Sequence, residues 1–256
     1  MLDGLSAYIT SALAENLALL PGNPGSATYI QAKIDMLRDP ALATAIRSDR
    51  RWAESTTSRV PIALVFPLES MRSEASLAVR TLEPVLPLLE EFFAKPFPSP
   101  AVRVWYGFKV GNSGGGGSIF SEDRTTYETR TGPNRLPFDA ILAHELGHSY
   151  IGTEGLNQFL ELYAYNVVRT GSRIPSAWIF TRSWVPGAAA NQDVAAVLDV
   201  YQLIGYDAMT RGFRAIEPLR PPYGSPLSTT VIQTFVDQVP AEYRSQVTDK
   251  LRRVMF

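Results

Sequence analysis

The segment His144-Glu145-Leu146-Gly147-His148 contains both histidines of the chain and a glutamate between them. Residues four apart on an α-helix project from the same face, so His144 and His148 can bind one metal ion with their imidazole rings. Glu145 lies about 100° further round the turn, where its carboxylate reaches a water at the metal rather than the metal itself. The pattern predicts a zinc hydrolase. A buried helix whose histidines only pack or form hydrogen bonds is the structural alternative.

A hydrolytic zinc site needs a third protein ligand and an open position for water. The chain has no cysteine and no further histidine, so this ligand must be a carboxylate. Glu154 follows His148 by six positions and would point about 240° away on one continuous helix. We expect Gly152 to end the first helix in a left-handed conformation and Thr153 to cap a second helix that folds back.

Glu154 would then face the first helix as the third ligand. Glu161, seven positions further along the same stripe, would accept a hydrogen bond from a histidine ring nitrogen and orient that ring. The reverse assignment, with Glu161 as the ligand and Glu154 as the orienting group, remains open. Glu154 could also be an ordinary carboxylate at a helix N-terminus, which would leave the site one ligand short.

Residues 144–161 resemble the gluzincin metallopeptidases, especially the groups typified by aminopeptidase N and by glycyl aminopeptidase. The shared features are the His-Glu-x-x-His helix, an aromatic residue and a glycine after it, and a Glu-Gly-hydrophobic stretch with a further glutamate. The resemblance is specific over residues 138–165 and weaker over about 60–215. The segment between the second histidine and the ligand glutamate is much shorter here than in those groups.

The resemblance implies that His144, His148 and Glu154 bind Zn²⁺ and that Glu145 is the general base. The implied activity is hydrolysis of peptide bonds in a peptide or protein substrate, through a water activated at the zinc. Two other functions remain open. One is a catalytically silent zincin-fold protein that binds peptides, and the other is a zinc hydrolase of a non-peptide amide or ester.

The expected elements form an α+β fold that resembles a zincin, with a small mixed sheet, the metal-binding helix and a mainly helical C-terminal lobe. Apolar or alternating runs predict strands over 61–66 and 102–110, and one or two more over 118–130. Apolar spacing predicts helices over 70–93 and 155–169, with further helices after them. We expect three segments: a helical segment over 1–58, a sheet lobe over 59–152 that ends in the metal-binding helix, and a helical lobe over 153–256.

The glycine run Gly114–Gly117 allows two interpretations. It lacks the Lys-Ser/Thr of a phosphate-binding loop, and β-prone sequence on both sides argues against a synthetic linker. A hairpin turn is the plain interpretation. In gluzincins, however, the strand before the metal helix forms the rim of the substrate cleft, where Gly115, Gly116 and Gly117 would let a peptide approach closely.

The aminopeptidase groups carry in this region a glutamate that binds the free amine of the substrate. Its position here falls among the glycines, and only Glu122 or Asp123 could replace it. We therefore expect an endopeptidase rather than an aminopeptidase. Gluzincins also stabilise the oxyanion with a tyrosine or histidine, and no histidine is left for this role. The tyrosine candidates are Tyr165, Tyr201, Tyr206 and Tyr223, and a packing role is the plain interpretation of each.

The composition is that of a folded globular protein, with 45% apolar and 19% charged residues. A net charge of −1 provides no basic surface, so we expect no nucleic-acid partner. We interpret residues 2–20 as an amphipathic helix rather than a signal peptide, and no apolar run is long enough to span a bilayer. The sequence assigns neither the compartment nor the oligomeric state.

Overall fold

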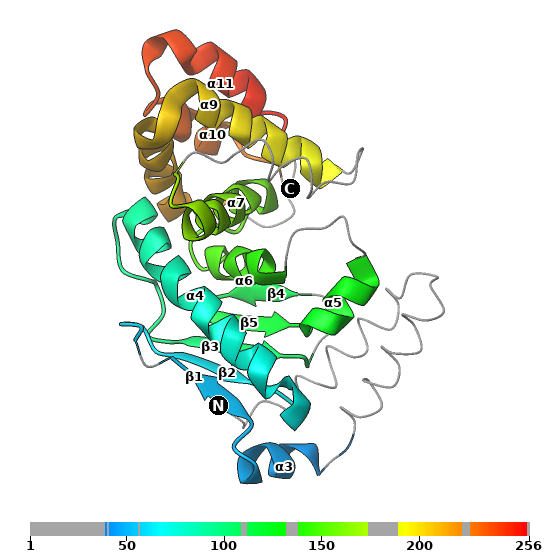
Figure 1. Ribbon diagram of the computed structural model, residues 1–256. Helices are drawn as coiled ribbons and strands as arrows, with labels where there is room; N and C mark the ends of the chain where they lie inside the picture. The colour runs from blue at the N-terminus through cyan, green and yellow to red at the C-terminus, as the bar shows by residue number, and fades with distance from the viewer. Residues whose placement is uncertain are drawn as a thin grey trace. The chain divides into compact units, whose positions relative to one another are not determined.

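The computed structural model describes residues 39, 41–55, 57–108, 112–131, 138–173, 189–221 and 226–254 (Figure 1). The chain divides into two compact units, and each is described by itself. Unit 1 comprises residues 1–83 and 99–133, and unit 2 comprises residues 84–98 and 134–256. The three-segment division given above stays a prediction, and the amphipathic helix expected over residues 2–20 lies outside the described residues.

Unit 1 contains a five-stranded mixed sheet with the order β1-β2-β3-β5-β4. The strands are β1 (Trp52–Glu54), β2 (Ile62–Val65), β3 (Val102–Tyr106), β4 (Ser113–Gly115) and β5 (Ser118–Ser121). The central pairs β2–β3 and β3–β5 are parallel, and the two edge pairs are antiparallel. Three of the four residues of β2 are buried, as expected for a parallel strand covered on both faces. The α+β class with a small mixed sheet is confirmed.

The parallel pair β2–β3 requires a crossover connection, which α4 (Arg72–Phe93) provides. Residues 72–83 of α4 belong to unit 1, and residues 84–93 to unit 2. The helix predicted over 70–93 and the strand predicted over 61–66 are therefore confirmed. The strand predicted over 102–110 is confirmed as far as Tyr106, whereas Gly107 and Phe108 lie outside it. The helical prediction for residues 1–58 is wrong at β1, which pairs with β2, and right at α3 (Leu42–Ser48).

The second half of the segment 118–130 is helix, not strand. Residues Arg124–Thr131 form α5 because Asp123 caps its first turn. The two carboxylate oxygens of Asp123 accept hydrogen bonds from the backbone N and the hydroxyl of Thr126, at 2.9 and 2.8 Å. Such a cap satisfies donors that have no partner inside the helix. The local capping interaction therefore overrides the β-prone composition.

The described part of unit 2 is mainly helical, as predicted. It contains the end of α4, α6 (Phe138–Gly147), α7 (Glu154–Thr170), α9 (Ala189–Ile216), α10 (Thr229–Val236) and α11 (Arg244–Leu251). Aromatic rings fill its core: Phe92 packs against Phe159, Tyr163 and Phe213 with ring centroids 5.2–6.2 Å apart. This cluster fixes one end of α4 to α7 and α9.

None of the described helices is both long enough and apolar enough to cross a membrane.

Candidate metal centre

The motif His144–His148 lies where α6 ends and the chain turns into α7. Leu142 and Leu146 are fully buried, which places the apolar face of α6 in the core of unit 2. The helix ends at Gly147. The hydrogen bonds that follow span three residues instead of four, from Ser149 N to Leu146 O at 3.1 Å and from Tyr150 N to Gly147 O at 2.9 Å. The turn therefore begins earlier than the sequence suggested.

Two details of the expected turn are wrong. Gly152 does not have a positive φ angle, so the first helix does not end there through a left-handed residue. Thr153 is the N-cap residue of α7, but its side chain makes no capping hydrogen bond. The chain reverses instead through hydrogen bonds between residues three apart, Leu146 with Ser149 and Gly147 with Tyr150.

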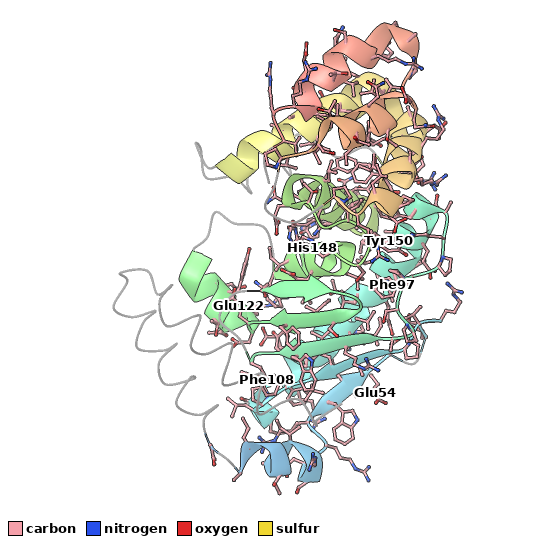
Figure 2. The ribbon with its side chains drawn as sticks, turned by 180° about the vertical axis from the view of Figure 1, so that it is seen from behind. Glu54, Phe97, Phe108, Glu122, His148 and Tyr150 are labelled. Atoms are coloured by element: carbon pink, nitrogen blue, oxygen red, sulfur yellow. The ribbon has the colours of Figure 1, made fainter. Side chains whose placement is uncertain are left out.

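Tyr150 anchors this turn. Its ring stacks on Phe93 with centroids 4.3 Å apart and an interplanar angle of 2°, and it meets Phe97 edge-on at 5.9 Å (Figure 2). The ammonium group of Lys95 lies 5.7 Å from the centroid of the same ring. The aromatic residue after the motif thus holds the turn against the 84–98 segment of unit 2.

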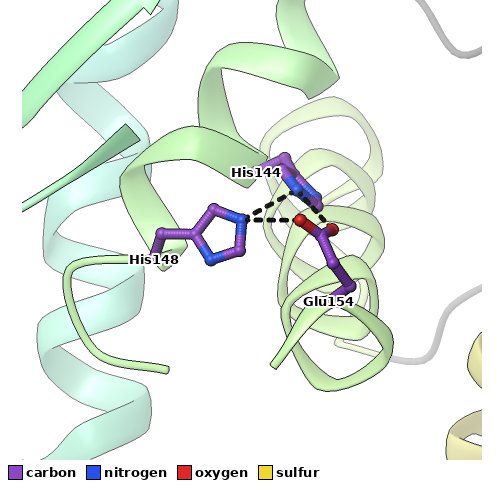
Figure 3. A group of neighbouring side chains, drawn as sticks. All are labelled: His144, His148 and Glu154. Atoms are coloured by element: carbon purple, nitrogen blue, oxygen red, sulfur yellow. Dashed lines mark hydrogen bonds and ion pairs between the residues drawn. The ribbon is translucent and has the colours of Figure 1, made fainter. Parts of the chain in front are cut away.

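The side chains of His144, His148 and Glu154 converge on one point, His148 from one side and His144 and Glu154 from the other (Figure 3). The Nε2 atoms of the two histidines are 3.1 Å apart. Glu154 places Oε2 at 3.1 Å from His144 Nε2 and Oε1 at 3.3 Å from His148 Nε2. These three side chains could hold a metal ion.

The other ring nitrogen of each histidine has a partner that fixes the orientation of the ring. His148 Nδ1 lies 3.1 Å from the carbonyl oxygen of Ile151, which can only accept a hydrogen bond. His144 Nδ1 lies 2.9 Å from Oε2 of Glu161, which is 2% exposed. With Nδ1 as the donor in both rings, the Nε2 lone pairs face each other and the carboxylate of Glu154.

This arrangement needs a positive charge at its centre, because acceptor atoms point at one another across about 3 Å. Without a metal, a proton can supply that charge. Burial alone would lower the pKa of His144, but hydrogen bonds to Glu154 and Glu161 outweigh burial and raise it. Burial alone would raise the pKa of Glu154, but the hydrogen bonds to both histidines hold that pKa well below its usual range. A metal cation would compete with the proton.

The donor set fits a zinc-sized ion. Donor atoms of a tetrahedral site with bonds of about 2.0–2.1 Å are about 3.3 Å apart. The two Nε2 atoms, 3.1 Å apart, are close to this spacing, and each lies 3.1–3.3 Å from a different oxygen of the Glu154 carboxylate. One donor atom from each of the three residues lies within 4.8 Å of the others. Two imidazoles with one carboxylate also form a recognised ligand set of catalytic zinc.

Glu145 lies beside the cluster without joining it. Glu145 is 5% exposed, and its Oε2 atom has no hydrogen-bond partner among the described residues. Burial raises the pKa of its carboxyl group, against the opposing effect of the two imidazoles. The structure thus separates Glu145 from Glu154 and Glu161, both of which contact histidines.

The glycines predicted as a substrate rim lie in the β4–β5 hairpin of unit 1. Gly116 and Gly117 have φ angles of 56° and 80°, which the tight turn requires. At Gly117 a Cβ atom would also lie 2.3 Å from the hydroxyl of Ser99. A Cβ atom at Gly115 would meet no atom within 4 Å. The hairpin explains two of the glycines, and the rim role of Gly115, Gly116 and Gly117 stays a prediction.

Three of the tyrosine candidates engage other groups. The Tyr201 hydroxyl donates to the carbonyl oxygen of Arg173 at 2.7 Å, and the Tyr165 hydroxyl accepts a bond from Arg169. The Tyr206 hydroxyl lies 3.5 Å from that of Tyr163. Tyr223 lies outside the described residues.

Asn157 is a site residue that the sequence analysis missed. It is fully buried, and its Nδ2 atom donates to the backbone carbonyl of His144 at 2.7 Å. Its spacing from Glu154 was the available signal, because residues three apart share a helix face.

No protein-family model matches the chain, and no curated protein sequence matches it either. The resemblance to gluzincins therefore stays a prediction, and the chemistry of the site has to be argued from its own geometry.

Proposed function

We propose that the protein is a zinc-dependent metallopeptidase with a zincin-like fold, related to the gluzincins. The observation that carries this proposal is the convergence of His144 Nε2, His148 Nε2 and the Glu154 carboxylate within 3.1–3.3 Å, each histidine being oriented through Nδ1. Zinc is the metal that best suits two imidazoles and one carboxylate at this spacing, with a fourth position left for water.

A zinc ion held by these three residues would polarise the substrate carbonyl and lower the pKa of a water. Glu145 would then accept a proton from the attacking water and pass it to the leaving nitrogen. Its Oε2 atom is suited to this exchange because no described group already occupies it. Glu161 would hold the His144 ring in place through Nδ1.

Cleavage of internal peptide bonds is the favoured mode of action. An aminopeptidase needs a carboxylate for the substrate amine, because burying an unpaired ammonium group is costly. Of the two replacement candidates, Asp123 uses both carboxylate oxygens to cap α5. Glu122 is fully buried at the end of β5, where its Oε1 accepts a bond from Asn112 at 3.2 Å (Figure 2). Both carboxylates therefore have structural roles within unit 1.

One observation favours the catalytically silent alternative. The Tyr201 hydroxyl already donates its proton to the carbonyl oxygen of Arg173, and the hydroxyls of Tyr165 and Tyr206 contact Arg169 and Tyr163 rather than the three converging side chains. Loss of one donor to the oxyanion typically lowers the rate of an enzyme by about 100- to 1,000-fold while the metal site persists. A protein that binds zinc and peptides without cleaving them is therefore the second candidate.

Metal analysis combined with a cleavage screen tests the proposal. Purified protein should contain one zinc per chain and should cleave blocked peptides at internal bonds, as read by mass spectrometry. The Glu145→Gln variant should keep the zinc and lose the cleavage. Zinc without cleavage of any peptide would support the silent alternative, and cleavage of esters alone would indicate a non-peptide hydrolase. Absence of zinc from protein refolded with excess metal would refute the proposal.

A further inference from the structure

Three residues of α7 contact three different parts of His144. Glu154, Asn157 and Glu161 follow one another at spacings of three and four, so they form one stripe of the helix. Glu154 lies at Nε2 of His144, Glu161 lies at Nδ1, and Asn157 bonds its backbone carbonyl oxygen. The middle contact of the stripe is therefore made to the main chain of the metal-binding turn.

The His144 carbonyl lies at the end of α6, where carbonyl groups run out of good partners within the helix. It accepts a long bond from His148 N at 3.3 Å, and Asn157 Nδ2 provides a second bond at 2.7 Å. This one oxygen atom thus connects the backbone of both histidines to α7. A shift of the turn along α7 would break the short bond.

Gly147 makes this contact sterically possible. A Cβ atom built on Gly147 would lie 2.0 Å from Oδ1 of Asn157 and 3.1 Å from its Cγ. Among the described residues, Oδ1 has no hydrogen-bond partner, although Asn157 is fully buried. A leucine would fill such a position without leaving a polar atom unpaired. The amide is therefore explained by its bond to His144 rather than by packing.

We propose that Asn157 is a positioning residue that fixes the register of α6 against α7. Gly147 has no side chain, and the space that it leaves, called the socket below, receives the Asn157 amide. In this register Glu154 and Glu161 meet opposite nitrogens of the same ring. The role in metal binding rests on the function proposed above, whereas the contact between Asn157 and Gly147 does not depend on it.

The first test compares Asn157→Leu with a matched control. Asn166 is also a buried asparagine of α7, and its Nδ2 donates to a backbone carbonyl, that of Ser172, away from the histidines. We expect Asn157→Leu to weaken zinc binding by at least tenfold in a chelator competition, as loss of groups that support metal ligands commonly does. The absorption spectrum of the cobalt(II)-loaded protein should also change.

Asn166→Leu should lower the melting temperature but leave the zinc affinity and the cobalt spectrum unchanged. Equal weakening in both variants, or wild-type affinity in Asn157→Leu, would overturn the metal-positioning role.

The second test uses metal-free protein and decides the contact itself. Gly147→Ala should lower the melting temperature in the wild-type background, because the new methyl group collides with the Asn157 amide. The same substitution made together with Asn157→Ala should cost little or nothing, since the colliding atom has been removed. Equal shifts in the two backgrounds would overturn the proposed socket. If the wild-type protein binds no metal, the proposed function and the metal-positioning role both fail, but this comparison still decides the socket.

Discussion

Replacement of Glu161 by glutamine separates the group that orients His144 from the groups that would hold the metal. Glu161 is 2% exposed, and its Oε2 atom accepts the Nδ1 proton of His144 at 2.9 Å. A glutamine of the same shape can still accept this proton, but without the negative charge that roughly doubles the strength of such a bond. We therefore expect Glu161→Gln to bind zinc about tenfold more weakly, the low end of the range for groups that support metal ligands.

The expected size of the effect follows from linkage between binding and folding. At a free zinc concentration 100 times the wild-type Kd, binding stabilises the folded protein by about 2.7 kcal/mol. A tenfold weaker variant gains only about 1.4 kcal/mol at the same concentration, and a hundredfold weaker one about 0.4 kcal/mol. With about 2–4 °C per kcal/mol for a chain of this length, zinc should raise the melting temperature of the wild type by about 5–11 °C. The increase should be about 3–6 °C in Glu161→Gln.

Thermal unfolding with zinc and with a chelator measures this difference directly. The new amide NH₂ group takes the place of Glu161 Oε1, which has no hydrogen-bond partner among the described residues, so the variant can be less stable even without metal. For that reason the zinc-dependent increase, not the absolute melting temperature, is the quantity to compare. A wild-type increase in Glu161→Gln would refute the orienting role. Complete loss in Glu161→Gln, together with a full increase in Glu154→Gln, would make Glu161 the ligand instead.

Three further outcomes are expected. His148→Ala and Glu154→Ala should each lose stoichiometric zinc in elemental analysis, because each removes one of three converging ligands. Peptides with free and acetylated N-termini should be cleaved at similar rates, whereas a hundredfold preference for the free amine, about 2.7 kcal/mol, would reveal an amine site, with Glu122 the first residue to substitute. Burial and the neighbouring Glu74 raise the pKa of Tyr106, so its contribution to stability is complete below about pH 10 and is lost above that pH as the unfolded chain ionises. Tyr106→Phe should therefore reduce the alkaline fall in the free energy of unfolding by up to about 1.4 kcal/mol per pH unit, measured by urea unfolding.

The parts of the fold that the sequence predicted are those with strong hydrophobic patterns. The runs that became β2, β3 and α4 carry apolar residues at the spacing of their elements, and tertiary packing agrees with that spacing. The errors occurred where a single polar contact or strand pairing decides the outcome. Asp123 caps α5 within a β-prone segment, and the short strand β1 takes its hydrogen-bonding partners from β2.

The convergence of His144, His148 and Glu154 was predictable because their spacing in the sequence is local. His144 and His148 lie one turn apart, and a helix break after them is enough to bring Glu154 and Glu161 back to the two ring nitrogens of His144. The nature of that break was not predictable. Gly152 was the obvious candidate, but the helix ends at Gly147, where the absence of a side chain leaves room for Asn157. Gly147 thus takes part in the turn and also leaves room for the packing of α7 on α6.

The grouping of all these contacts on His144 explains why one helix pair suffices to build the site. A metal ligand must be fixed in position, in orientation and in protonation state, and the described structure assigns a separate residue of α7 to each requirement. Asn157 fixes the backbone of the residue, Glu161 fixes the ring and its tautomer, and Glu154 completes the charge at Nε2. The ring of His148 is oriented by the carbonyl oxygen of Ile151 in its own turn, and its Nε2 atom faces Glu154 of α7. We therefore expect substitutions along the α7 stripe to affect the proposed metal binding through His144 first, whereas substitutions that disturb the turn around Tyr150 should act through His148.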